Sequence, residues 1–249
     1  MTSADKMNTA GSSTSRDGRR ISPAVGFAMI FPFVLTLIYF VLLAGQETGL
    51  QNMVFGALKV VQFGFPAFYV FFILRESFSL PVSKQPAWRM SIGFGVAVFL
   101  AVLGIYFGLL KGTASYDVLQ TKVLEKVQGF GLNSVGAYGA FALFYCIAHS
   151  ALEEYYWRWF VFKRLRDPLG PWQAIIMSSV AFMAHHVILM VVFFGIASPL
   201  AWIFSLCVAV GGGMWAWLYQ RSDHLFAIWV CHAIVDAALF FVGYDLIFN

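Results

Sequence analysis

The chain has 249 residues, of which 60% are hydrophobic and only 11% are charged, and its formal net charge is +4. A soluble domain carries about 25% charged residues, so this composition excludes a soluble globular protein and indicates an integral membrane protein in a lipid bilayer. Positive charge in such a protein is typical of its topology. No segment interleaves basic residues with exposed aromatic ones, so we expect no nucleic-acid partner.

The N-terminal segment, residues 1–20, is rich in Ser, Thr, Gly and charge, and three arginines precede the first apolar run. A segment of this kind cannot bury apolar surface, which predicts a disordered basic tail on the cytoplasmic side. The apolar run at about 21–44 is too long for the hydrophobic part of a signal peptide, so it predicts an uncleaved membrane anchor. We expect residues 21–249 to form a single transmembrane domain.

The apolar runs predict the fold class. A membrane-spanning helix needs about 20 predominantly apolar residues, and this criterion predicts an all-α polytopic bundle with about seven spans. The spans cover approximately residues 22–44, 53–74, 88–110, 135–161, 172–194, 197–220 and 224–243. Lys and Arg are concentrated in the segments on the side of the N-terminal tail, which predicts a cytoplasmic N-terminus and an outer C-terminus.

The one long loop, residues 111–134, carries Val and Leu at helical spacing. This spacing favours an eighth, amphipathic helix on the outer surface, and a solvated connector is the alternative.

Small residues inside the spans indicate where helices pack closely. Gly104 and Gly108 have the four-residue spacing that favours such contacts, and Gly93, Gly95 and the glycine run 211–213 are further candidates. The three cysteines lie in apolar runs without ligand-like spacing, so they predict buried thiols rather than disulfides or metal ligands.

The fourth span carries two adjacent carboxylates and an arginine in an apolar and aromatic run. An ionised group at that depth costs roughly 3 kcal/mol or more unless it is paired, so such residues indicate a functional site. Glu154 and Arg158 are four residues apart, which predicts an ion pair on one helix face. Glu153 lies about 100° around the helix, on the face of His149 and Trp157. Because an ion pair needs only one carboxylate, Glu153 is the candidate general base for water.

Two later spans carry similar polar groups. In the fifth span, Phe182 and His186 are four residues apart, so the phenyl ring can pack against the imidazole, while His185 points about 100° away. In the seventh span, His232 and Asp236 are again four residues apart, so the carboxylate can orient or charge the imidazole. At 1.5 Å per residue, the polar groups of the three spans reach a similar depth, which predicts a single site.

Three motifs in this order, Glu-Glu-x-x-x-Arg, Phe-x-x-x-His and His-x-x-x-Asp on separate spans, resemble those of the CAAX-type intramembrane proteases. That family, also called CPBP or Abi, includes the eukaryotic Ras-converting endoprotease. The resemblance covers about residues 135–240, the expected catalytic core. It implies hydrolysis of a peptide bond in a membrane-associated peptide or protein, and lipidated CaaX proteins are the family's best-known substrates.

The resemblance also implies roles for six residues. They are Glu153, Glu154, Arg158, His186, His232 and Asp236. By analogy, Glu153 and His186 hold and activate the water, and His232 and Asp236 support the oxyanion. An oxyanion needs hydrogen-bond donors, and Asp236 donates only when it is protonated, whereas many relatives have asparagine there. Orienting His232 is therefore the safer assignment for Asp236.

The resemblance leaves a second role and a cofactor open. The pair of Glu154 and Arg158 is expected to hold the helix, and contact with a substrate carboxylate is its second candidate role. We expect no cofactor. The alternative is a zinc-dependent protease in which His186, His232 and Glu153 are the ligands, although the sequence contains no His-Glu-x-x-His motif.

Other classes of function fit the sequence less well. A non-catalytic family member, acting as a scaffold or a bacteriocin-immunity protein, could lose motif residues, yet all are present here. A transporter predicts two similar halves with broken helices, and a haem-binding bundle predicts facing histidines without the glutamate pair. The short tail and compact architecture favour a prokaryotic inner membrane, with the site open toward the cytoplasm.

Overall fold

The predicted spans are all helical in the computed structural model, which describes residues 20–77 and 87–249. Within those ranges seven helices are long and apolar enough to cross a membrane, and no residue forms a strand. The seven helices are Pro23–Leu42, Gly49–Ile73, Trp88–Leu110, Val135–Leu169, Pro171–Phe194, Pro199–Ser222 and Leu225–Phe248. The predicted all-α bundle is confirmed, while the tail predicted for residues 1–20 lies, apart from Arg20, outside the described residues.

The fourth span extends beyond its predicted end near residue 161. Its helix continues to Leu169 and stops where Gly170 takes a φ of 81° ahead of Pro171. A glycine with positive φ commonly ends a helix. The added turns carry the charged residues of KRLRDPL, which a criterion based on apolarity leaves out.

Several spans combine α-helix with a π-helical stretch. The α-helices are α1 (Pro23–Leu37), α2 (Thr48–Phe68), α3 (Ala87–Ile105), α4 (Ala114–Gly129), α5 (Val135–Phe144), α6 (Ser150–Glu154), α7 (Lys163–Leu169), α8 (Pro171–Phe194), α9 (Pro199–Ser222) and α10 (Leu225–Phe248). The π-helical stretches are η2 (Ile38–Leu42), η3 (Tyr69–Ile73), η4 (Tyr106–Leu110), η5 (Tyr145–His149) and η6 (Tyr155–Phe162). Stretches η5 and η6 flank α6, which carries the two glutamates, and π-helical geometry is frequent at functional sites.

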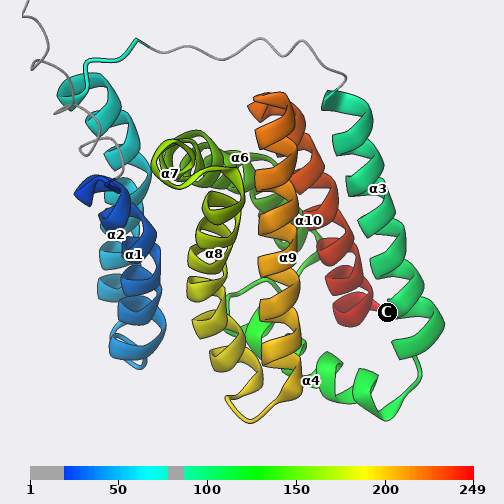
Figure 1. The fold of residues 1–249 in the computed structure, drawn as a ribbon. Coiled ribbons are helices and arrows are strands. Elements are labelled where there is room, and N and C mark those ends of the chain that lie inside the picture. Colours follow the sequence, from blue (N-terminus) through cyan, green and yellow to red (C-terminus); the bar gives the residue numbers. More distant parts are fainter. Residues whose placement is uncertain (1–19, 78–86) are drawn as a thin grey trace, which may run out of the picture.

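The helices surround the fourth span. Figure 1 shows α8 beside α9 and α10 beside α3, and both pairs are in close contact. Helix α1 contacts both α2 and α8, so the α1–α2 pair forms one side of the bundle. Stretch η6 contacts α1, α2, α8, α9 and α10. The fourth span therefore packs against most of the other spans, while α3 packs mainly against α10.

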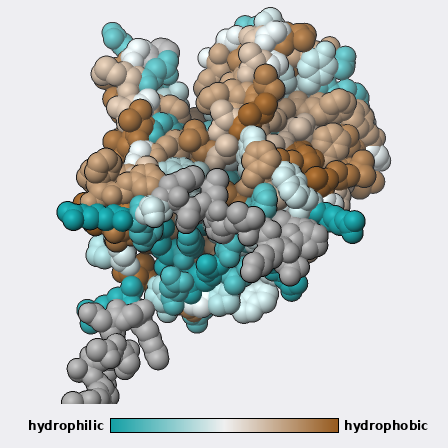
Figure 2. All heavy atoms as spheres, turned by 90° about the horizontal axis from the view of Figure 1, so that it is seen from above, coloured by the Kyte–Doolittle hydropathy of each residue, from teal (hydrophilic) through white to brown (hydrophobic). Residues whose placement is uncertain are grey.

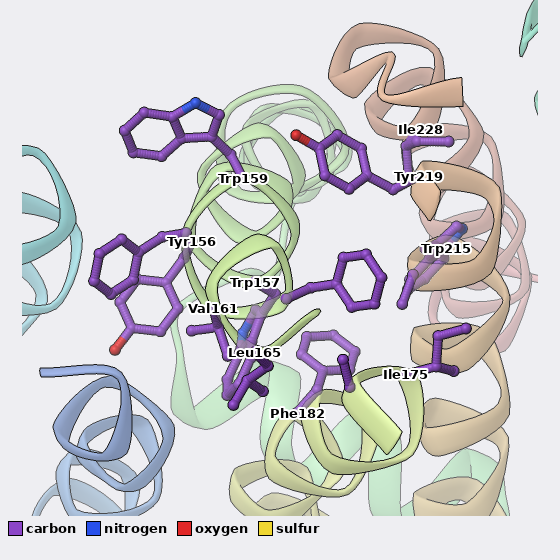
Figure 3. Packing of buried hydrophobic residues seen from close by; sticks show 14 of the residues in the cluster. Tyr156, Trp157, Trp159, Val161, Leu165, Ile175, Phe182, Trp215, Tyr219 and Ile228 are labelled. Atoms are coloured by element: carbon purple, nitrogen blue, oxygen red, sulfur yellow. The ribbon is translucent and has the colours of Figure 1, made fainter. Parts of the chain in front are cut away.

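An aromatic core fixes the fourth span. Seven of the eight residues of η6 are buried, and Figure 3 shows the aromatic side chains packed around them. The ring of Trp157 packs edge-on against Phe182 of α8, with centroids 5.6 Å apart. The ring of Phe162 packs against Tyr219 of α9 at 6.1 Å. This packing holds the helix that carries the two glutamates in one position.

The outer surface is suited to lipid. Large apolar side chains are exposed on several spans, among them Ile30, Val60, Phe72, Leu109 and Leu206. Figure 2 views the molecule from above and shows apolar side chains around much of the outline. Hydrophilic side chains gather over one part of this end of the molecule. Apolar sides with a polar end are the arrangement that a bilayer requires.

The predicted eighth helix is present as α4, so the alternative of a solvated connector is wrong. Leu119 of α4 is buried in a small cluster with Tyr106 and Leu246. Close by, Asp245 accepts a hydrogen bond from the hydroxyl of Tyr106 at 2.7 Å and forms an ion pair with Lys111. The Leu119 cluster holds α4 against the C-terminal end of α10, and the Asp245 contacts tie that end to the third span and the residue after it.

The predicted glycine contacts are wrong at Gly93, Gly104 and Gly108. A Cβ atom added at any of these positions would meet nothing within 4 Å. Spacing alone therefore does not indicate close packing, because these glycine faces do not meet a neighbouring helix.

The prediction is confirmed at Gly95 and Gly212. A Cβ on Gly95 would lie 3.1 Å from the carbonyl oxygen of Cys231 on α10, and one on Gly212 would lie 3.0 Å from Cδ1 of Phe182 on α8. These glycines allow α3 to approach α10 and α9 to approach α8.

The cysteines are free thiols, as predicted, but they are not all buried. Cys231 is buried and Cys146 is half-buried, whereas Cys207 is exposed. The prediction of burial is wrong for Cys207 because an apolar run in a membrane protein also has an outward face.

Candidate active site

The ion pair predicted for the fourth span is present and deeply buried. The Nε atom of Arg158 lies 3.1 Å from Oε2 of Glu154, and their side chains are 2% and 0% exposed. The guanidinium donates from Nη2 to the carbonyl oxygen of Gly212 at 3.3 Å. It also lies over the rings of Phe182 and Trp215, at 5.1 and 5.4 Å from their centroids. Burial this complete disfavours the second role expected for Arg158, contact with a substrate carboxylate.

Glu154 also contacts His232, which the sequence did not indicate. Its Oε1 atom lies 2.8 Å from Nδ1 of His232, and the imidazole stacks on Trp215 with centroids 3.9 Å apart. The other ring nitrogen, Nε2, lies 3.6 Å from Oδ1 of Asp236 and 3.8 Å from Oε2 of Glu153. An ionised carboxylate only accepts hydrogen bonds, so Nδ1 carries a proton and Nε2 faces the site. Glu154 therefore orients His232, the role that sequence analysis gave to Asp236.

Glu153 is the centre of the cluster. It is 6% exposed, and three imidazoles surround its carboxylate. Its Oε2 lies 4.0 Å from Nδ1 of His149 and 3.8 Å from Nε2 of His232, and its Oε1 lies 3.9 Å from Nε2 of His185. Each separation exceeds a hydrogen-bond length. At these separations a single water oxygen can lie within hydrogen-bond distance of both atoms of a pair.

The two adjacent histidines of α8 are held differently. Nδ1 of His186 lies 3.0 Å from the carbonyl oxygen of Phe182. Because a carbonyl only accepts, Nδ1 carries the proton and Nε2 has a free lone pair. The ring of Phe182 lies 4.8 Å from that of His186, which confirms the predicted packing. His185 is parallel to the ring of Trp157 at 5.9 Å, and its buried Nδ1 has no hydrogen-bond partner among the residues that the structure describes.

The residues present fit a metal ion such as zinc. Among the described residues, Glu153, His185 and His186 each offer a ligand atom, and these atoms lie within 4.8 Å of one another. Two imidazole nitrogens and a carboxylate oxygen are a donor set that zinc accepts. The set differs from the expected one because His185 takes the place of His232.

The structure brings all six predicted site residues into one cluster of contacts and adds others. His149 and His185 approach Glu153, and Lys59 of α2 interacts with it electrostatically. The four-residue spacing of His149 and Glu153 was a visible signal for the first of these. No motif pointed to Lys59, because it lies in a span without any recognised pattern.

Residues 136–238 match the family model described as type II CAAX prenyl endopeptidase Rce1-like. The matched segment contains all six predicted site residues and begins after the first three spans. The family resemblance of this segment is confirmed, and with seven apolar helices it indicates an integral membrane protein. No curated protein and no solved structure matches the chain.

Proposed function

We propose that the protein is an intramembrane endopeptidase that hydrolyses a peptide bond in a membrane-associated substrate. The observation that carries the proposal is the buried Glu153 carboxylate with three imidazoles 3.8–4.0 Å away, within apolar spans. The Rce1-like match over residues 136–238 supports the same reaction class. A cytoplasmic opening of the site and a lipidated substrate are part of the proposal.

Glu153 and His186 activate the water in this proposal. The water donates one hydrogen bond to the Glu153 carboxylate and lies against the free Nε2 of His186. As the water oxygen bonds to the scissile carbonyl carbon, Glu153 takes its proton and later delivers it to the leaving amine as the C–N bond breaks. The apolar surroundings keep bulk water away, so each of these polar contacts is stronger than in solution.

His232 and Asp236 support the oxyanion in this proposal. Protonated His232 donates from Nε2, while its Nδ1–H is held by Glu154, which Arg158 in turn keeps in place. Asp236 adds a second donor when its carboxyl group is protonated. Preorganised donors of this kind stabilise the tetrahedral intermediate without reorganising during the reaction.

A metal-dependent version of the same activity is favoured by one observation, the approach of Glu153, His185 and His186. These three residues would hold the ion, which would lower the barrier by polarising water. His232 and Asp236 keep their roles in this version, since neither belongs to that group.

The test is cleavage of a prenylated CaaX peptide, and of its unprenylated counterpart, by purified protein in water enriched in ¹⁸O. We expect two fragments, with ¹⁸O in the carboxylate newly formed at the cleaved bond. Protein carrying Glu153→Gln serves as the control for a contaminating protease. Intact peptide with the wild type would contradict the proposal and favour a non-catalytic scaffold or immunity protein.

A further inference from the structure

A positive charge lies inside the second span without a carboxylate in contact. Nζ of Lys59 is 3.1 Å from Oε1 of Gln62, a neutral acceptor, and lies 5.4 and 5.3 Å from the ring centroids of Phe55 and Phe63. Within residues 20–77 and 87–249, no carboxylate lies within 4 Å of it. A lysine at membrane depth is expensive and is by default a functional-site candidate.

Lys59 faces the site rather than the lipid. Phe63, one turn along α2, packs edge-on against His149 and Tyr156, with centroids 6.5 and 6.1 Å apart. The Lys59 ammonium interacts electrostatically with Glu153, and also with His149 and His185. The next residue, Val60, is 74% exposed and points outward.

The position of Lys59 along its span argues against lipid phosphate as the natural anion. At 1.5 Å per residue, it lies about 15–20 Å from either end of the helix Gly49–Ile73, far from the level of the head groups. Arg158 is buried in its ion pair with Glu154 and is not accessible to a substrate. Among residues 20–77 and 87–249, Lys59 is therefore the cation near this cluster that an anionic group of a bound peptide would meet.

We propose that Lys59, assisted by Gln62, binds the free C-terminal carboxylate of the substrate. The inference rests on the proposed function and makes it more specific, because it limits cleavage to bonds near the end of a chain. Phe63 contacts both the Lys59 ammonium and the His149 ring, and Nδ1 of His149 lies 4.0 Å from Glu153. An extended peptide advances about 3.3–3.6 Å per residue, so this chain of contacts spans a few residues of a bound peptide. The carboxylate thus lies a few residues beyond the scissile bond.

The test compares one peptide in two forms, with a free C-terminal carboxylate and with a C-terminal amide. For the wild type we expect kcat/KM to be about 10- to 100-fold higher for the acid, the range of a charge-assisted contact. Lys59→Met should bring the acid-to-amide ratio close to one, and Lys59→Arg should restore most of it. Val60→Met, the same new side chain on the lipid face, should keep the wild-type ratio.

Two results would overturn the inference about Lys59 without contradicting the proposed peptidase activity. One is an acid-to-amide ratio near one in the wild type. The other is an equal loss for both peptides in Lys59→Met, which would make Lys59 only a counter-charge for Glu153.

A wild type that cleaves neither peptide would contradict the proposed function. The Lys59 site can still be tested in that case, by measuring how tightly the acid and the amide peptide bind. Tighter binding of the acid by the wild type, lost in Lys59→Met, would support this site. Equal binding of acid and amide would overturn it.

Discussion

Oε1 of Glu154 lies 2.8 Å from Nδ1 of His232, and this contact joins the first sequence motif to the third. The same carboxylate pairs with Arg158 through Oε2. The adjacent Glu153 instead faces a group of imidazoles. The two neighbouring glutamates therefore have different surroundings. Glu154 is in direct contact with His232 and Arg158, whereas the imidazoles around Glu153 lie beyond hydrogen-bond distance.

The Glu154–Arg158 pair should contribute strongly to stability. Glu154→Gln leaves the buried guanidinium without a counter-charge, and removing one partner of a buried pair costs roughly 3–5 kcal/mol. We expect a clear fall in the temperature of thermal unfolding in detergent. The double variant Glu154→Gln/Arg158→Met should recover part of that stability and remain inactive, because His232 still lacks its anionic acceptor. Full activity of the double variant would contradict the orienting role of Glu154.

Gly212 should not tolerate a side chain. Alanine there would place a Cβ 3.0 Å from Cδ1 of Phe182 and 3.8 Å from Nη2 of Arg158. Overpacking of this kind typically costs about 1–3 kcal/mol. Gly211→Ala is the matched control, because its Cβ would meet only ordinary contacts with Trp215, 3.6 Å away or more. Equal unfolding temperatures for the two variants would show that α8 and α9 separate without cost.

The role of Asp236 predicts a pH dependence. If its carboxyl group donates to the oxyanion, only the protonated form is active, so kcat/KM falls about tenfold per pH unit above its titration. Asp236→Asn donates at every pH, so we expect it to move this fall to higher pH, where protonated His232 loses its Nε2 proton. The loss of activity at low pH, where Glu153 takes up a proton, should remain. A wild-type profile that stays flat at high pH would assign Asp236 a structural role.

The metal-free account predicts that a strong chelator leaves peptide cleavage unchanged and that the purified protein holds no stoichiometric zinc. Metal content is measured together with activity, so the two results check each other. Loss of cleavage with chelator and its recovery with zinc would contradict this account. Loss of bound zinc in His185→Ala, but not in His149→Ala, would then assign His185 as a ligand.

The contacts that depend on helix geometry alone could be predicted from the sequence. Glu154 with Arg158, and Phe182 with His186, are four residues apart, so a single helix brings them together wherever it packs. The number of spans followed from apolar length for the same reason. Local periodicity is sufficient for features of this kind.

Contacts between helices could not be predicted in the same way. Gly104 and Gly108 have the expected spacing but meet no neighbour among the described residues, because their face of the third span is turned away from the bundle. His185 approaches Glu153, and Lys59 contacts the Phe63 ring that packs against His149, only because α8 and α2 are rotated as they are. Packing of the aromatic core around η6 sets those rotations, and no sequence motif indicates how a helix is rotated.

The most direct test of the central claim compares Glu153→Gln with Glu125→Gln, the same change at an exposed position on α4. The account predicts that Glu153→Gln lowers kcat/KM for the peptide at least 100-fold, the lower range for loss of a general base, and that Glu125→Gln has no effect. Near-wild-type cleavage by a folded Glu153→Gln protein would contradict the account, because the water would then be activated elsewhere.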